Sequence, residues 1–224
     1  MISPMAVAVA LLGGALPALA GGPPYDRAHL SACSSADEVF VDAETGEMRV
    51  HAEVGPTTSS NKGCAITSLW EGGFQVDPGV DYEVTARLRL LGGEWAPRAS
   101  VAPWGPGQLV SANEAVARVG VTLTPLVYGC SGTGECGPAS GRLQEDILAC
   151  QPFPWCESVE TLVSPPPIGR EITLSARVSM SDDYPIVGLL VVVRLRAQAE
   201  REGPPYEAVA RGGANLEEIV VRRL

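Results

Sequence analysis

The chain has 224 residues and a formal net charge of −10 at pH 7. Nucleic acids and anionic membrane surfaces bind basic patches, so this acidity argues against both classes of partner. The sequence is 46% hydrophobic, which is too apolar for a disordered chain, and its 25 glycines and 19 prolines favour frequent turns over long helices.

The first twenty residues carry no charged side chain, and an apolar run begins at Met5. Ala18 and Ala20 fit the small-residue pattern of a signal-peptidase site, and the run is too short to span a membrane. We therefore expect a signal peptide over 1–20 and a mature chain that begins at Gly21. The protein is expected to be secreted, extracellular or periplasmic, without a membrane span. A buried N-terminal helix is the alternative.

Alternation of apolar and polar residues with a period of two predicts strands along most of the chain. In 81–90 (DYEVTARLRL), for example, Tyr82 and Val84 share one face and Glu83 and Thr85 share the other. The run at 186–198 starts apolar on both faces, which favours a central strand. In chain order, strands are predicted at 38–42, 47–54, 64–70, 81–90, 99–103, 117–127, 158–163, 170–180, 186–198 and 215–224.

Six cysteines follow the signal peptide, an even number that favours disulfides in an oxidising compartment. Zinc sites use pairs of cysteines separated by two to four residues, whereas two pairs here have five residues between them, and no CxxC redox motif is present. Local pairing predicts the disulfides Cys130–Cys136, Cys150–Cys156 and Cys33–Cys64. The nested alternative joins Cys130 to Cys156 and Cys136 to Cys150.

These patterns predict one all-β domain over 21–224, an antiparallel β-sandwich of jelly-roll type. A disulfide-stapled loop insertion is expected at 129–157. Within it, Leu143 and Ile147 lie one helical turn apart, which predicts a short helix over 142–149.

The segment 72–93 (GGFQVDPGVDYEVTARLRLLGG) resembles a hairpin of the jelly-roll carbohydrate-binding modules in the galactose-binding-like superfamily. The final segment, 215–224 (NLEEIVVRRL), is similar to the last strand of those modules. The resemblance covers these two segments and implies a jelly-roll fold and carbohydrate binding. The six cysteines and the insertion depart from the family pattern. The residues that match the hairpin are Phe74, Val76, Pro78, Gly79 and Tyr82.

Aromatic residues in loops are the candidate ligand-binding residues, because a sugar ring stacks on an exposed aromatic face. Trp95 and Trp104 lie in a turn-rich segment, and Phe153 and Trp155 lie in the CQPFPWC loop, where a disulfide lowers the cost of ordering them. Each of these side chains has the alternative of packing as a lid over the core. Trp70 ends a predicted strand and is expected in the core.

No cofactor is expected, and calcium is the metal that the sequence leaves open. Oxygen-rich loops on β-sandwiches hold calcium through carboxylates and backbone carbonyls. Asp42, Glu44 and Glu217, together with Glu47 and Glu218, would meet if the first and last strands pair, as they often do in jelly rolls. Solvated carboxylates are the alternative.

No catalytic motif is visible. The chain has neither a G-x-S-x-G nor a phosphate-binding loop, and His29 and His51 are interpreted as solvated surface residues. A glycosidase needs two carboxylates about 5–10 Å apart, and sequence spacing does not show that any pair converges. The candidates for such a pair are Asp77, Asp81, Glu94, Asp182 and Asp183.

We therefore expect a secreted, non-enzymatic binding protein that recognises a polysaccharide or glycan through its loop aromatics. The alternative is a structural or assembly component of a cell envelope or extracellular coat that binds protein partners.

Overall fold

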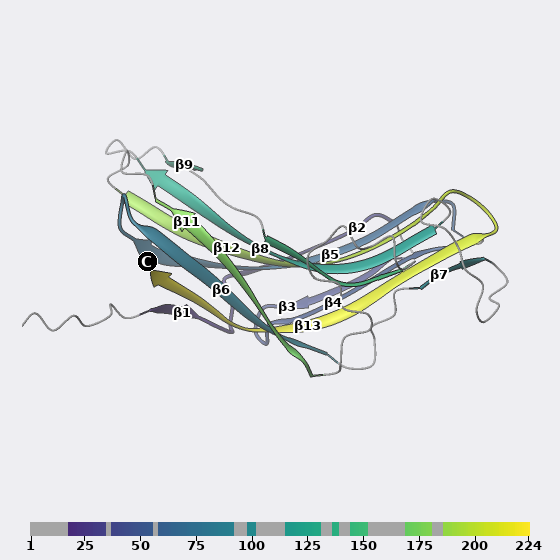
Figure 1. Cartoon of the computed structure of the whole chain (residues 1–224), viewed down its shortest axis with the longest axis horizontal. Helices are drawn as coiled ribbons and strands as arrows, with labels where there is room; N and C mark the ends of the chain where they lie inside the picture. Colours follow the sequence, from purple (N-terminus) through teal and green to yellow (C-terminus); the bar gives the residue numbers. More distant parts are fainter. Residues whose placement is uncertain are drawn as a thin grey trace, which may run out of the picture.

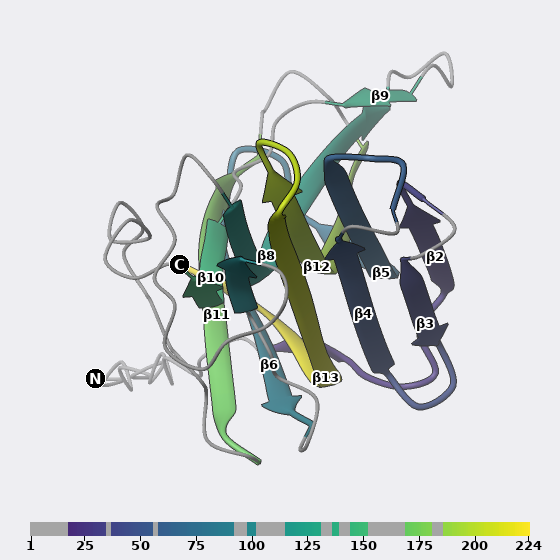
Figure 2. The same cartoon turned by 90° about the vertical axis from the view of Figure 1, so that its right-hand side faces the viewer.

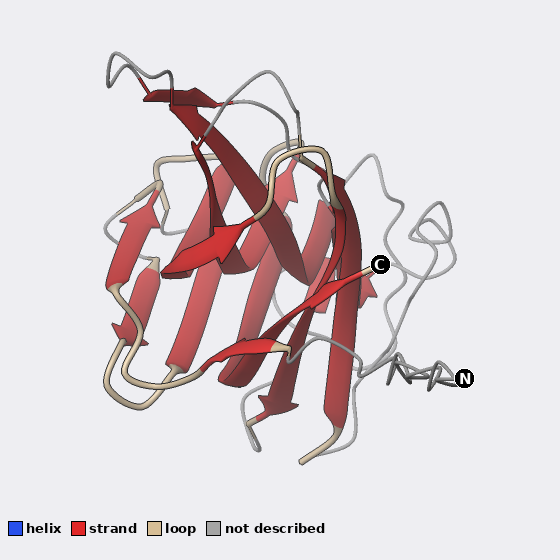
Figure 3. Cartoon of the chain, turned by 90° about the vertical axis from the view of Figure 1, so that its left-hand side faces the viewer, coloured by secondary structure: helices blue, strands red, loops and turns tan. Residues whose placement is uncertain are grey.

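The computed structural model describes residues 18–34, 37–55, 58–91, 98–101, 115–130, 136–138, 144–151, 169–180 and 186–224. These residues form thirteen strands and no helix (Figure 3). The described part therefore contains no helix that is long and apolar enough to cross a membrane. The strands make two antiparallel sheets that pack face to face, which confirms the expected β-sandwich.

The first sheet is built around β13, the strand that comes last in the chain. Its first half pairs with β4 and β7 and its second half with β6 and β1, so four strands depend on it. Across the sheet the order is β3 (Glu38–Asp42), β4 (Glu47–Val54), β13 (Tyr206–Arg223), β6 (Asp81–Leu90) and β11 (Glu171–Ser179), with β1 (Leu19–Gly21) and β7 (Arg98–Val101) added along β13.

The second sheet places β12 between β8 and β5, which confirms the predicted central strand. Figure 1 shows that the two sheets curve in the same sense, so that the outer face of the second sheet is concave and that of the first is convex. The order across the second sheet is β10 (Gln144–Gln151), β8 (Ala115–Cys130), β12 (Ile186–Arg201), β5 (Lys62–Val76) and β2 (Arg27–Ala32), with β9 (Cys136–Pro138) beside β8.

The core lies between the sheets and follows the predicted alternation. In β6 the apolar residues Tyr82, Val84, Ala86, Leu88 and Leu90 are buried, while the polar residues between them are intermediate or exposed. Burying one leucine or valine side chain contributes about 1.5–3 kcal/mol. The apolar face of each strand therefore fixes its register, because a shift of one residue would expose that face.

Residues 144–149, the described part of 142–149, do not form the predicted helix. The described part of this segment belongs to β10, whose backbone pairs with β8 from Gln144 opposite Leu123 to Gln151 opposite Ala117. Pairing with a sheet edge satisfies every second backbone group of the strand, and this tertiary gain outweighs a weak local helical preference. The expected loop insertion thus contributes two strands, β9 and β10, to the second sheet.

The segment 72–93 is not a hairpin within one sheet. Its first strand, β5, belongs to the second sheet and β6 belongs to the first, so the turn at Asp77–Val80 crosses the sandwich. The hydroxyl of Tyr82 accepts a hydrogen bond from the backbone N–H of Asp77 at 2.9 Å and holds this crossing.

The disulfide Cys33–Cys64 is present and joins the end of β2 to β5. Asp37 reinforces the same junction with one carboxylate. Its oxygens accept hydrogen bonds from the backbone N–H groups of Ser34 at 2.9 Å, Glu53 at 3.1 Å and Cys64 at 3.3 Å.

The strand register also bears on the other cysteines. Cys130 and Cys136 are direct partners across β8 and β9, and partners in neighbouring antiparallel strands have the Cα separation that a disulfide needs. Cys150 instead lies opposite Arg118. Arg118 and Cys130 are twelve residues apart on β8, which corresponds to about 40 Å at the rise of a strand. The nested Cys136–Cys150 pairing would have to span this separation, and the pairing of these four cysteines stays a prediction. Cys156 lies outside the described residues.

The described residues test the remaining sequence predictions only in part. The predicted strand at 158–163 lies outside them, while the one at 99–103 appears as β7. The expected signal-peptide cleavage after Ala20 stays a prediction, and β1 crosses that position, with Leu19 and Ala20 paired to Val221 and Val220.

Candidate functional site

The concave outer face of the second sheet contains a hollow of about 520 Å³. It lies where β5, β12 and β8 run side by side, close to the end of the sandwich that holds the start of β2. Two aromatic side chains, Trp70 and Tyr128, are among its walls, and both are partly exposed. The remaining lining residues are Asp26, Arg27, Gly72, Gly73, Phe74, Gln75, Gly188, Leu189 and Leu190.

Strand phase explains how the aromatic residues reach this face. Along β5, Trp70 alternates in step with Ser68, whereas Leu69 points into the core and is fully buried. Trp70 is opposite Val192 of β12, and Tyr128 of β8 is opposite Gly188 of the same strand. The two rings therefore rise from the strands on either side of β12. The expectation that Trp70 belongs to the core was wrong.

Glycines form the floor of the hollow. A Cβ atom added to Gly188 would meet nothing within 4 Å, so the space above this strand position is open. At the end of β5, Gly73 has a φ of +76° and an added Cβ would again meet nothing. The register between β5 and β12 shifts between Leu189 and Val191, which is a bulge that bends the strand beside the hollow.

The rim of the hollow is polar. Asp26 accepts a hydrogen bond from the backbone N–H of Gly72 at 2.7 Å, which ties the segment before β2 to the hollow. Arg27 and Gln75 complete this rim. The indole Nε1 of Trp70 is buried and has no hydrogen-bond partner among the described residues. Hydrogen-bonding groups thus surround a glycine floor that lies between two aromatic side chains.

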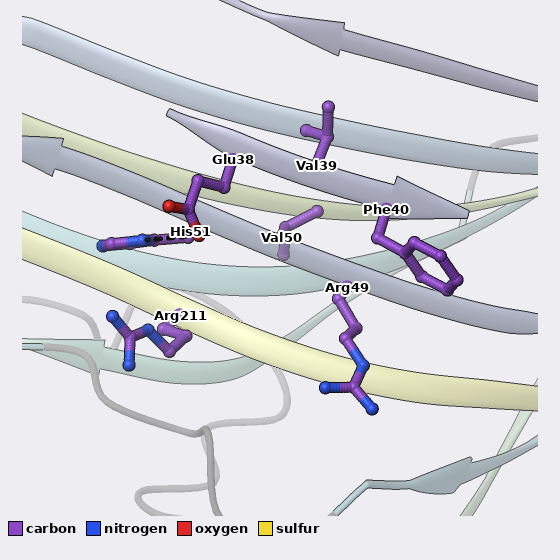
Figure 4. A pocket seen from close by; sticks show the side chains of 7 residues that line it. All are labelled: Glu38, Val39, Phe40, Arg49, Val50, His51 and Arg211. Carbon is purple, nitrogen blue, oxygen red and sulfur yellow. Dashed lines mark ion pairs between the residues drawn. The ribbon is translucent and has the colours of Figure 1, made fainter. Parts of the chain in front are cut away.

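A second hollow, of about 320 Å³, lies on the convex face of the first sheet. Figure 4 shows the Glu38 carboxylate beside the His51 ring, with Arg49 and Arg211 nearby and Phe40 at the far end. His51 lies 3.8 Å from Glu38 and 3.6 Å from Glu53, and its side chain is only 13% exposed. It does face outward as predicted, but it is largely covered rather than solvated. His29, in contrast, is exposed.

The four aromatic residues predicted to bind ligand cannot be placed relative to the hollow. Trp95, Trp104, Phe153 and Trp155 all lie outside the described residues. Sequence reasoning missed Trp70 and Tyr128, although the signal for Trp70 was present in its phase with Ser68 rather than Leu69.

The residues predicted for calcium come close in the backbone but do not form a ligand set. Leu216 of β13 donates its N–H to the carbonyl of Gly46 at 2.9 Å, so the turn after β3 does meet the last strand. Asp42 accepts hydrogen bonds within this turn, and Glu217 forms an ion pair with Arg89. Glu44 is exposed. No three His, Cys, Asp or Glu side chains gather as a metal site among the described residues.

An acidic neighbourhood surrounds Tyr25 at the edge of the sandwich. The Tyr25 hydroxyl is buried and donates to the carbonyl of Leu216 at 3.0 Å. Burial raises the pKa of Tyr25, and the carboxylates of Glu71, Glu217 and Glu218 raise it further. Burial also raises the pKa of Glu71, with a smaller contribution from Asp26.

The carboxylates in the concave hollow do not have the arrangement of a glycosidase. Asp26 is the one carboxylate among the residues that line it. Hydrolysis by the usual two-carboxylate mechanism needs a second acid on the opposite side of the bond to be cleaved. The described walls therefore offer surfaces for binding and hydrogen bonds, without a pair of acids.

Comparison of the sequence with protein-family models and with curated proteins found no match. Comparison of the structure with solved structures found several carbohydrate-binding modules. One is TmCBM61, solved in complex with β-1,4-galactotriose, at 12% identity, with 91% of this chain and 92% of that chain covered and a TM-score of 0.33. Another is a CBM4 module, at 8% identity, with 90% and 97% covered and a TM-score of 0.30.

A third is the CBM22-1–GH10 part of a Clostridium thermocellum endo-1,4-β-D-xylanase, complexed with xylohexaose. It is 10% identical, with 87% of this chain and 26% of that chain covered and a TM-score of 0.29. Carbohydrate-binding modules, which the segment 72–93 resembles, are therefore among the solved structures to which this chain is similar, each at a TM-score below 0.5.

Proposed function

We propose that this chain is a secreted, non-catalytic carbohydrate-binding protein whose glycan lies across the concave face of the second sheet. One observation supports this most strongly: Trp70 and Tyr128 stand on the two strands that flank an open glycine floor at Gly188. The disulfide Cys33–Cys64 suits an oxidising, extracytoplasmic compartment.

The chemistry of the hollow suits a sugar. A pyranose ring has an apolar face of C–H groups, which packs on an aromatic ring, and an edge of hydroxyls, which needs hydrogen-bond partners. Trp70 and Tyr128 supply aromatic rings for the C–H face. Asp26, Arg27 and Gln75 supply hydrogen-bond partners for the hydroxyls. Trp70 and Tyr128 lie on strands about 10 Å apart and at levels of β12 four residues, or about 13 Å, apart, so the rings are spaced to contact separate units of one chain.

The proposed site is tested by a substitution that fills the glycine floor of the hollow with a side chain and leaves the fold unchanged. Gly188→Leu places a side chain in open space, so the variant should fold as the wild type does. Its affinity for the bound glycan should fall at least about tenfold, the effect of losing roughly 1.4 kcal/mol of contact. Gly203→Leu is the matched control, since a Cβ there also meets nothing and Gly203 lies in the turn between β12 and β13.

Binding would be measured by depletion on a panel of soluble and insoluble polysaccharides, with tryptophan fluorescence as a second readout. Trp70→Ala should reduce both signals. Retention of full affinity by Gly188→Leu would contradict the proposed site, and no binding across the panel would contradict the function. Parallel runs with calcium and with chelator test the calcium that the sequence leaves open, because a loss of binding in chelator alone would support it.

A second candidate function is attachment to a protein partner at the sandwich edge. Figure 2 shows β2 and β3 side by side there. Leu30 on β2 is 53% exposed and Phe40 on β3 is 47% exposed, and both strands are sheet edges with free backbone groups. Sedimentation of the wild type and of Leu30→Ser/Phe40→Ser tests this function, which predicts a complex or oligomer that the double variant loses.

A further inference from the structure

The concave face is basic although the chain as a whole is acidic. The formal net charge is −10, yet basic residues outnumber acidic ones at the outward positions whose side chains are described on β2, β5, β8 and β12. Among the described side chains, two carboxylates border this face, Glu200 on β12 and Asp26 ahead of β2. The outward basic residues are Arg27, Lys62, Arg118, Arg194 and Arg196.

Arg194 and Arg196 extend the aromatic hollow along β12. Arg194 is opposite Ser68, two residues from Trp70 on β5, and Arg196 is opposite Gly120 on β8. The two arginines therefore lie about 7 and 13 Å beyond the level of Trp70 along the strands.

Both arginines are exposed and have no carboxylate partner in the described part of the chain. Arg194 donates from Nε to the hydroxyl of Ser68 at 3.3 Å, which orients the guanidinium and uses one of its five N–H donors. Among the described residues no side chain accepts a hydrogen bond from the remaining donors of Arg194.

The convex face of the first sheet shows the opposite arrangement. There Arg87 pairs with Glu218, and Arg89 pairs with Glu217. Arg87 and Arg89 on that face are thus paired with carboxylates of β13, whereas Arg194 and Arg196 beside the hollow have no carboxylate partner among the described residues. A guanidinium without an acidic neighbour is suited to a carboxylate or sulfate, which it binds through two parallel hydrogen bonds.

We propose, on the basis of the function proposed above, that the glycan bound by this face is acidic. Its sugar rings stack at Trp70 and Tyr128, and Arg194 and Arg196 bind the carboxylates or sulfate esters of the units that follow. The basic face also attracts such a polymer from solution, an effect that salt screens.

The experiment compares four ligands on the mature protein: a polyuronate, its methyl ester, a sulfated glycan and a neutral glycan. The acidic polymers should bind at least about tenfold more tightly than the ester and the neutral glycan, since one charge-assisted hydrogen bond contributes that much. Arg194→Gln/Arg196→Gln should remove the preference. Arg177→Gln/Arg222→Gln, which removes two exposed arginines from the other sheet, should keep it.

The outcomes separate this inference from the function on which it rests. A preference for the polyuronate or for the sulfated glycan supports the inference and identifies the anionic group. Equal binding of the polyuronate and its ester, with both lost in Gly188→Leu, overturns the acidic ligand and leaves carbohydrate binding intact. Equal losses in the two double variants overturn it too, as does tighter binding of single-stranded DNA in competition. Failure to bind any polysaccharide overturns both proposals.

Discussion

Removal of the Cys33–Cys64 disulfide should lower the free energy of unfolding substantially while leaving the fold in place. The two cysteines are 31 residues apart, and closing a loop of that length in the unfolded chain is worth about 3.7 kcal/mol at 25 °C. The native junction has a second support, because the Asp37 carboxylate binds three backbone N–H groups there. The loss in Cys33→Ala/Cys64→Ala therefore acts mainly through the unfolded state.

The assay is urea unfolding at equilibrium, followed by tryptophan fluorescence. The midpoint should fall, and the dependence on urea should steepen, because the unfolded chain without the cross-link exposes more surface. A loss below about 1 kcal/mol, which lies at the low end of measured disulfides, would refute the loop-closure reasoning. A variant that no longer folds would show that the Asp37 contacts do not hold the junction alone.

Four further substitutions test individual contacts. Asp37→Ala should cost about 3 kcal/mol in urea unfolding, since three charge-assisted hydrogen bonds are lost, and Asp37→Asn should cost less. Burial raises the pKa of Glu71 above its ordinary value of 4.5, so the folded state keeps a proton that the unfolded state releases. The free energy of unfolding therefore falls as the pH rises from 4.5 through the raised pKa. Glu71→Gln should remove this fall in a series of melting temperatures against pH. Tyr25→Phe loses the buried hydrogen bond to Leu216 and should cost about 1 kcal/mol by urea unfolding. Gly46→Ala should cost about 1–3 kcal/mol in the same assay, because the residue has a φ of +80° and its Cβ would collide with the carbonyl of Leu216. An unchanged stability in any of these variants would contradict the contact assigned to it.

The sequence predicted the faces of the strands better than their connections. Period-two alternation identified the buried side of β6 correctly, because burial on one face is a local property of each strand. Whether β5 and β6 share a sheet depends on the packing of distant strands, so the turn at Asp77–Val80 looked like a hairpin. The same reason explains β10, whose weak helical pattern gave way to pairing with the edge of β8.

The candidate site was harder to predict than the fold. Trp70 could have been placed on the outer face from its phase, but an apolar residue at a strand end also suits a core. The hollow itself depends on Gly188 facing Tyr128 and on the bulge in β5, and no short stretch of sequence contains both. The basic face is equally hidden, because its arginines are scattered along strands of an acidic chain.

The position of β13 in the chain has a consequence for biosynthesis. Four strands pair with residues 206–223, and these are made after every one of those strands. While the chain is being synthesised, the first sheet lacks its central strand, so β4 and β6 present open edges that invite pairing with other chains. The first sheet can therefore close only after residues 206–223 have been made, however early its other strands leave the ribosome.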